Sequence, residues 1–125
     1  MGPKLAFAMA ADKTKFVFDR QALARLALHC DIVREVPLDT FEGAAARAVL
    51  ADIDILVTGW GCPTITAEVI KAAPRLRLIA HAAGTVKYMI DPAVYAAGIT
   101  VTHAADANAV PVAEFTLASI IFANK

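Results

Sequence analysis

Apolar positions along this chain follow two periods. Short aliphatic runs are typical of strands covered on both faces, and between them apolar residues recur at helical spacing. Strands are predicted at residues 4–9, 31–36, 55–57, 75–83 and 99–103. Helices are predicted between them at residues 19–29, 41–51, 65–73 and 92–97, with a loop at 10–14. This alternation predicts the α/β class, with a parallel sheet and crossover helices.

The order of these elements resembles the flavodoxin-like doubly wound fold, a five-stranded parallel sheet with the strand order 2-1-3-4-5. In such sheets ligands bind beyond the carboxyl ends of the strands. Those ends fall at residues 10–11, 58–61, 83–86 and 104–108. The binding site is therefore expected in these loops.

Two of the loops carry candidate binding residues. Gly84, Thr85 and Val86 offer successive backbone N–H groups where a strand turns into a loop, and such a turn can form a concave nest for a carboxylate. Most Gly-Thr pairs at strand ends only turn the chain, so both interpretations stay open. Trp60 stands between two glycines in TGWGC, where it is either a pocket wall or a side chain packed over the sheet edge.

Composition limits the partners of the chain. Twelve basic and twelve acidic residues cancel and form no basic stripe, so nucleic acid is not an expected partner. Cys30 and Cys62 lie far apart without C-x-x-C spacing, which is typical of reduced thiols in a cytoplasmic protein and offers no metal site. No membrane span is expected, since the apolar C-terminal segment falls short of the roughly 18 residues that a spanning helix needs.

The titratable residues show no catalytic pattern. His29, His81 and His103 each stand alone in sequence, and structural roles are expected for all three, with His103 nearest to the loop face. No serine or cysteine stands in a recognisable arrangement with a histidine and an acid. The dinucleotide fingerprint G-x-G-x-x-G is not found either, since GWGCPT has the first two glycines without the third.

The C-terminal segment DANAVPVAEFTLASIIFANK is apolar nearly all the way round if it is helical. Between Ala109 and Ala123 its only charge is Glu114. A helix of this kind must be buried, and we expect its cover to come from outside residues 1–125.

Three motifs follow one another in the second half of the chain. They are the strand and A-G loop of LIAHAAGTVK, the pattern D-x-x-x-x-x-x-G-I-x-V at residues 91–101, and N-x-x-x-V-A-E at residues 108–114. In this order and spacing they resemble the D-isomer-specific 2-hydroxyacid dehydrogenase family. Residues 58–79 fit the same family, whereas the first fifty residues add only a compatible α/β pattern.

The resemblance implies an oxidoreductase that interconverts a small 2-hydroxy acid and its 2-oxo acid by hydride transfer with NAD or NADP. Family members join a flavodoxin-like substrate domain to a Rossmann NAD(P)-binding domain through a long helix. By this resemblance residues 1–107 are the substrate-binding domain, and residues 108–125, with a helix at 111–124, are the hinge and interdomain linker. The family's catalytic Arg, Glu and His and its cofactor fingerprint belong to the other domain, so none is assigned here and the chain alone is expected to be inactive.

The same resemblance implies six substrate-binding residues, on a loop that holds the substrate carboxylate, on a loop that lines the pocket and at the domain hinge: Gly84, Thr85, Val86, Trp60, Gly61 and Asn108. The common family pattern A-G-V-G-x-D is replaced here by A-G-T-V-K, with no second glycine and one residue more. The particular 2-hydroxy acid and the choice between NAD and NADP therefore stay open.

A second hypothesis is a free-standing flavodoxin-like binding or interaction module without catalysis. In that module the apolar C-terminal segment docks on a partner. Under the dehydrogenase hypothesis the large apolar residues of the C-terminal helix need cover in this chain, and a second copy is the expected source, giving a homodimer. These residues are Phe115, Leu117, Ile120, Ile121 and Phe122.

Overall fold

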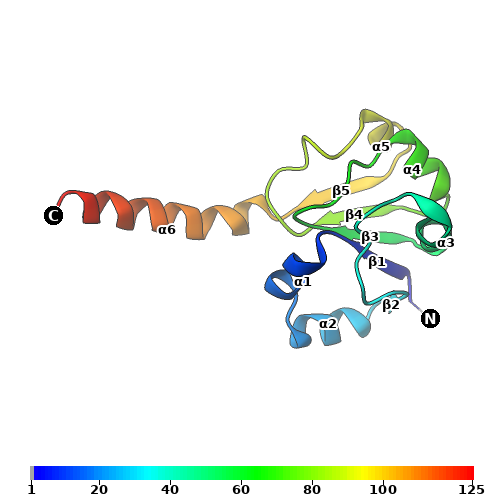
Figure 1. Cartoon of the computed structure of the whole chain (residues 1–125), viewed down its shortest axis with the longest axis horizontal. Helices are drawn as coiled ribbons and strands as arrows, with labels where there is room; N and C mark the ends of the chain where they lie inside the picture. The colour runs from blue at the N-terminus through cyan, green and yellow to red at the C-terminus, as the bar shows by residue number, and fades with distance from the viewer. Residues whose placement is uncertain (1) are drawn as a thin grey trace.

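A parallel sheet of five strands organises the chain in a computed structural model that describes residues 2–125 (Figure 1). The strand order is β2-β1-β3-β4-β5, which confirms the predicted fold class and order. The strands are β1 Lys4–Ala8, β2 Asp31–Ile32, β3 Ile55–Thr58, β4 Leu78–His81 and β5 Thr100–His103. The helices are α1 Ala11–Val17, α2 Arg20–Ala27, α3 Gly43–Asp52, α4 Ala67–Ala72, α5 Pro92–Ala96 and α6 Ala105–Ala123.

Alternating side chains of the strands build a core on each face of the sheet. On one face, α3, α4 and α5 pack over Leu56 and Ile79, which are fully buried. On the other face, α2 packs over Leu5 and Phe7, and the ring centroid of Phe18 lies 5.2 Å from that of Phe7. The central strands are therefore covered on both faces, as their continuous aliphatic runs predict.

Helix α1 contradicts the predicted loop at residues 10–14. It begins at Ala11, and its first turn is held by the Lys13 N–H, which donates to the carbonyl of Ala10 at 3.0 Å. The Thr14 hydroxyl donates to the same carbonyl at 3.4 Å. None of the α1 residues is buried. The helix therefore produces no apolar periodicity from which a sequence pattern can be read.

Strands β2 and β4 are shorter than predicted. Strand β2 pairs with β1 only at Asp31–Ile32, and the chain then leaves the sheet and returns at Leu38, whose N–H donates to the carbonyl of Phe7 at 2.8 Å. Strand β4 begins at Leu78 rather than at residue 75. In both cases only pairing with a neighbouring strand decides the length, and residues outside the paired stretch follow their own contacts.

The boundaries of α5 agree with its sequence signals. The Asp91 carboxylate accepts a hydrogen bond from the Ala93 N–H at 2.8 Å, and Pro92 occupies the first helical position. Gly98 follows the helix with φ of +73°, the left-handed conformation that glycine adopts most readily.

Helix α6 projects away from the sheet, and none of its residues is buried (Figure 1). It begins at Ala105, before the predicted residue 111, so Pro111 lies inside the helix rather than in its first turn. With 19 residues it is long and apolar enough to cross a membrane, a test that the core helix of a soluble protein also passes. The expectation that this segment is too short to span a membrane is therefore wrong. The predicted helix began at residue 111 and did not include the turns from Ala105 onward.

Candidate functional site

Backbone hydrogen bonds tie neighbouring loops together along the carboxyl edge of the sheet. The Ala10 N–H donates to the carbonyl of Trp60 at 2.9 Å, which joins the loops after β1 and β3. The Ala104 N–H donates to the carbonyl of Ala83, also at 2.9 Å, which joins the loop after β4 to the start of α6. The edge therefore consists of two tied pairs of loops, and the six predicted binding residues are divided between them.

The pair of loops after β4 and β5 brings Gly84 and Asn108 together. A Cβ atom added to Gly84 would lie 3.4 Å from Nδ2 of Asn108, so the amide side chain borders this glycine directly. Within residues 2–125 the N–H groups of Gly84, Thr85 and Val86 donate to no protein acceptor. The Thr85 hydroxyl accepts from the Lys87 N–H at 3.3 Å, which closes the turn. Three free backbone donors and a side-chain amide thus lie on one short loop and the helix beside it.

The pair of loops after β1 and β3 holds the other two predicted residues. Trp60 is 48% exposed, so its ring lies at the surface of the edge rather than in the core. Gly61 has φ of +79°, and a Cβ atom at this position would lie 2.7 Å from Cβ of Ala10. Glycine is therefore required at Gly61 by both backbone conformation and space. Within the described chain no hydrogen bond joins Trp60 or Gly61 to the loop of Gly84.

Two of the histidines lie at the ends of neighbouring strands. His81 and His103 are register partners in β4 and β5, and Nδ1 of His81 lies 2.9 Å from the hydroxyl of Thr58 in β3. Burial lowers the pKa of His81, and the charge of His103 lowers it further, so His81 is neutral near pH 7. Nδ1 of His103 accepts from the Ala105 N–H at 3.2 Å, at the start of α6. Each of the two side chains thus has a hydrogen-bond partner within the fold, which suits the structural roles expected of them. The bond between Thr58 and His81 could not be found from sequence, because only the strand register brings the two together.

The thiol of Cys62 shows no sign of activation. Burial raises the pKa of Cys62 to about 12, and its thiol donates to the carbonyl of Pro63 at 3.3 Å. Cys30 and Cys62 are both free. In the part of the chain that the structure describes, no group of three His, Cys, Asp or Glu side chains could hold a metal ion.

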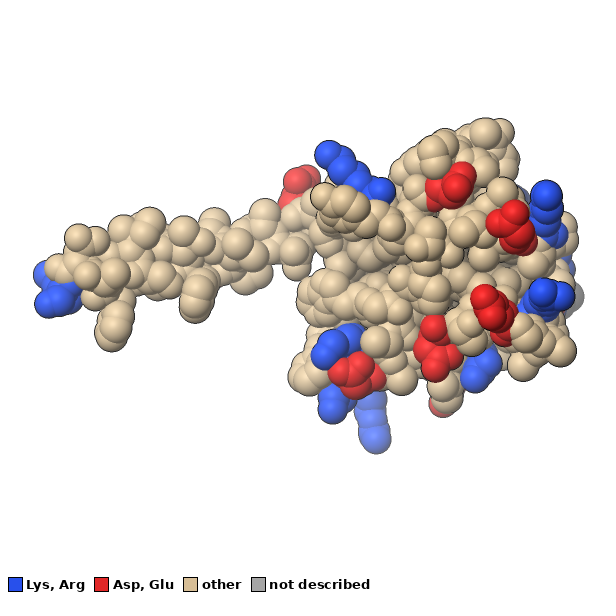
Figure 2. Space-filling view, turned by 45° about the horizontal axis from the view of Figure 1, so that its top comes forward, with Lys and Arg blue, Asp and Glu red and all other residues tan. Residues whose placement is uncertain are grey.

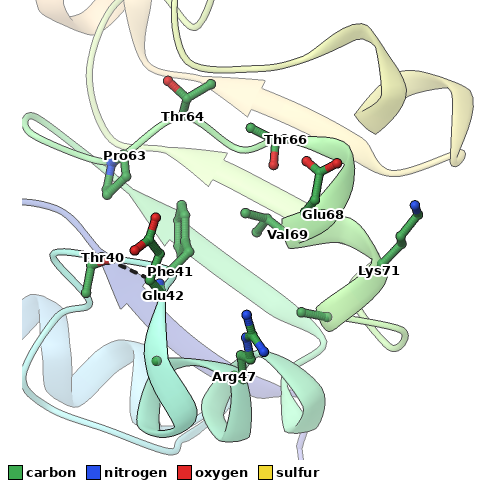
Figure 3. A pocket seen from close by; sticks show the side chains of 12 residues that line it. Thr40, Phe41, Glu42, Arg47, Pro63, Thr64, Thr66, Glu68, Val69 and Lys71 are labelled. Atoms are coloured by element: carbon green, nitrogen blue, oxygen red, sulfur yellow. Dashed lines mark hydrogen bonds between the residues drawn. The ribbon is translucent and has the colours of Figure 1, made fainter.

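A separate groove of about 770 Å³ lies between α3 and α4 (Figure 3). Phe41 and Val69 contribute apolar surface to it, and both belong to the same core cluster. Arg47 and Lys71 line the groove together with two acidic side chains, so it carries no excess of one charge. None of the six predicted binding residues lines this groove. It offers no convergent set of donors comparable to the loop of Gly84.

Comparison with protein families identifies the chain. The family model described as D-isomer specific 2-hydroxyacid dehydrogenase, catalytic domain, matches residues 17–123. The chain belongs to this family. The match covers α2 through α6. The similarity to the family, which the motifs indicate from residue 78 onward, therefore extends over most of the chain. No curated protein matches the chain.

Several solved structures share the fold of this chain. The PH0520 protein of Pyrococcus horikoshii is 26% identical with a TM-score of 0.69, over 94% of this chain and 32% of that one. A phosphoglycerate oxidoreductase from Rhizobium etli is 21% identical with a TM-score of 0.70, over 95% of this chain and 36% of that one. D-Lactate dehydrogenase from Aquifex aeolicus, complexed with NAD and lactic acid, is 24% identical with a TM-score of 0.59, over 94% and 32%. The chain thus spans about a third of the length of these proteins.

The residues of this dehydrogenase-family chain do not fit a dinucleotide cofactor. A Rossmann site needs three spaced glycines between a strand and a helix, so that the backbone can approach the pyrophosphate. After β3 the chain supplies only Gly59 and Gly61, and eight residues separate the end of the strand from α4. An added Cβ at Gly59 would lie 3.2 Å from the Met9 side chain, so this glycine makes room for the core and not for a ligand.

Proposed function

We propose that this chain is the substrate-binding domain of an NAD(P)-dependent oxidoreductase that interconverts a small 2-hydroxy acid and its 2-oxo acid by hydride transfer. One observation carries the proposal: within residues 2–125 the N–H groups of Gly84, Thr85 and Val86 have no protein acceptor, and Gly84 lies beside the amide of Asn108. A loop of successive N–H donors suits an anion, and a carboxylate accepts several such bonds at once. Membership of the dehydrogenase family supports a 2-hydroxy acid as the source of that carboxylate.

In this proposal the chain orients the substrate and performs no bond making. Backbone donors fix the carboxylate, and Trp60 and Gly61 form the pocket wall on the neighbouring loops. Orientation of this kind lowers the barrier of a reaction only when the reacting groups are also present. We propose that those groups and the cofactor come from a second domain that α6 joins to this one. The 125-residue chain alone should therefore oxidise no NADH with any 2-oxo acid, and turnover by the pure chain would contradict this assignment.

Titration of the labelled chain with pyruvate tests the carboxylate site. We expect the amide signals of Gly84, Thr85 and Val86 and the side-chain amide of Asn108 to shift together in ¹H–¹⁵N spectra. Gly84→Ala places a methyl group in the cradle without backbone strain, since Gly84 does not have a positive φ. The variant keeps its backbone N–H groups, and a methyl group that holds the carboxylate away from one or two of these donors weakens binding about tenfold or more.

Gly98→Ala is the matched control. Gly98 has φ of +73° and open space around its Cβ position, far along the chain from the cradle. This variant should lose about 1 kcal/mol of stability and bind pyruvate as the wild type does. Equal binding by Gly84→Ala, or shifts centred on the groove between α3 and α4, would overturn the assignment of the site. Failure of the chain to bind any small 2-oxo acid at millimolar concentration would favour the interaction module instead.

A further inference from the structure

The two halves of the proposed site leave the sheet from neighbouring strands. The loop of Trp60 follows β3, and the carboxylate cradle, residues 84–86, follows β4. These strands pair with each other, and the last pair in their register is Thr58 and His81. The position of one loop relative to the other therefore depends on contacts made at this pair.

Thr58 and His81 are the two buried polar side chains at the carboxyl edge of the described sheet. Thr58 is fully buried and His81 is 6% exposed. The Thr58 hydroxyl lies 2.9 Å from Nδ1 of His81, and among residues 2–125 no other hydrogen bond between two side chains is buried. A buried polar group without a partner costs free energy, so this bond favours one arrangement of the two side chains.

Backbone hydrogen bonds continue this contact up to the start of the cradle. The Ala82 N–H donates to the Thr58 carbonyl at 2.8 Å, and the Ala83 carbonyl accepts from the Ala104 N–H at 2.9 Å. With the side chain of His81, three successive residues are thus held just before the cradle begins. The N–H groups of the cradle donate to no acceptor within residues 2–125, so their direction depends on the residues on either side.

Ion pairs do not hold these loops. Charged side chains of both signs are scattered over the sheet domain (Figure 2), and the ion pairs within residues 2–125 lie at the amino edge of the sheet or inside α1. The loop of Trp60 is tied to the loop after β1, by the Ala10 N–H. In the described chain the bond between Thr58 and His81 is therefore the side-chain hydrogen bond that joins the bases of the two halves.

We propose that His81 is a positioning residue, whose bond to Thr58 holds the carboxylate cradle in a fixed place relative to the loop of Trp60. A small 2-oxo acid then meets both halves of the site at once, and His81 itself touches no substrate. Binding groups must be held within about half an ångström of the productive geometry by side chains that are themselves fixed. This inference rests on the function proposed above, because it concerns how that same site is held together.

Two substitutions of Thr58 separate the hydrogen bond from packing. Thr58→Val keeps the volume of the side chain and removes the hydroxyl, whereas Thr58→Ser keeps the hydroxyl and removes a methyl group. Urea unfolding should show a loss of stability for both, since Thr58 is fully buried. Titration of the ¹⁵N-labelled chain should show pyruvate binding about tenfold weaker in Thr58→Val and unchanged in Thr58→Ser. Equal weakening in the two variants would show that packing alone matters and would overturn the proposal.

Order parameters of the backbone amides, measured without ligand, separate this inference from the proposed function. In the wild type the amides of Trp60 and Gly84 should have values of about 0.85, which are typical of rigid backbone. In Thr58→Val both should fall toward about 0.6, and in Thr58→Ser both should stay high. Failure of the wild type to bind pyruvate would contradict the proposed function, whereas unchanged order parameters in Thr58→Val would contradict the positioning role.

The ring of His81 in the wild type gives a test that needs no variant, should Thr58→Val not fold. Burial, and then the charge of His103, lowers the pKa of His81, so the ring is neutral near pH 7. A neutral ring held through Nδ1 keeps one tautomer, whereas a free ring exchanges between two. The ¹⁵N shifts of the His81 ring should therefore report a single tautomer at pH 7. Averaged shifts, like those expected for the exposed ring of His29, would overturn the proposal.

Discussion

Replacing Asp54 by Asn removes the charge of a nearly buried carboxylate at the amino edge of the sheet. The Asp54 side chain is 11% exposed. Its carboxylate accepts from the backbone N–H of Lys4 at 2.9 Å and from Nη2 of Arg75 at 3.1 Å. Its own backbone carbonyl accepts from the Arg77 N–H at 2.9 Å. One residue thus joins β1, the start of β3 and the approach to β4.

The expected loss follows from the bonds that asparagine cannot make. The amide oxygen of Asn still accepts from the Lys4 N–H, whereas the ion pair with Arg75 is lost. A hydrogen bond to a charged group contributes about 1.5–3 kcal/mol, and Arg75, half exposed, recovers part of this from water. We expect Asp54→Asn to lower the free energy of unfolding by about 2 kcal/mol. Asp52→Asn is the matched control, because Asp52 is 47% exposed, its partners Lys4 and Arg75 are 37% and 50% exposed, and each such exposed pair contributes at most about 1 kcal/mol.

Urea unfolding monitored by circular dichroism measures both changes. With a urea dependence of about 1–3 kcal/mol per molar, Asp54→Asn lowers the midpoint by about 1 M. The pH dependence gives a second check, because the Lys4 N–H and then the Arg75 guanidinium hold the pKa of Asp54 below its ordinary value. A lowered pKa stabilises the fold at pH values above the unfolded pKa of about 3.9, and this contribution is lost as the pH falls through the lower folded pKa. The wild type and Asp54→Asn should therefore converge in acid. Equal losses for Asp54→Asn and Asp52→Asn, or a gap between wild type and Asp54→Asn that persists in strong acid, would refute the reasoning.

Three further predictions concern single positions. Gly61→Ala should lower the melting temperature more than Gly43→Ala. Both glycines have positive φ, but only at Gly61 would the new methyl group lie 2.7 Å from Cβ of Ala10. We therefore expect the free energy of unfolding to fall by about 2 kcal/mol or more for Gly61→Ala and by about 1 kcal/mol for Gly43→Ala. Equal melting temperatures would show that the loop moves freely. Pro111→Ala should strengthen the helical circular dichroism signal at 222 nm, since proline inside α6 disfavours the helix by about 3 kcal/mol relative to alanine. An unchanged or weaker signal would contradict this prediction. Cys62, with its thiol pKa raised to about 12, should react with a maleimide near neutral pH far more slowly than free cysteine, whereas rapid labelling would show that the thiol is not buried.

Much of the fold follows from sequence pattern alone. Continuous aliphatic runs predict β1 and β3 because central parallel strands are buried on both faces. Asp91, Pro92 and Gly98 predict the start and end of α5, because each acts through its own backbone conformation or side chain. The alternation of elements predicts the strand order, and the motifs from residue 78 onward indicate the family that the comparison identifies. These features depend on local chemistry, which the sequence contains in full.

Other structural features depend on contacts between residues that are far apart in the sequence. Helix α1 has no buried residues, so its sequence carries no apolar periodicity that would predict a helix. Strand β2 is short because it pairs with β1 over only two residues. The bond between Thr58 and His81 and the position of Asn108 beside Gly84 depend on strand register and on the direction in which α6 leaves β5. The apolar pattern of α6 showed that it needs cover. Only the tertiary structure shows that a one-residue connection points the helix away from its own sheet, because direction is set by contacts around Ala104 that sequence spacing does not contain.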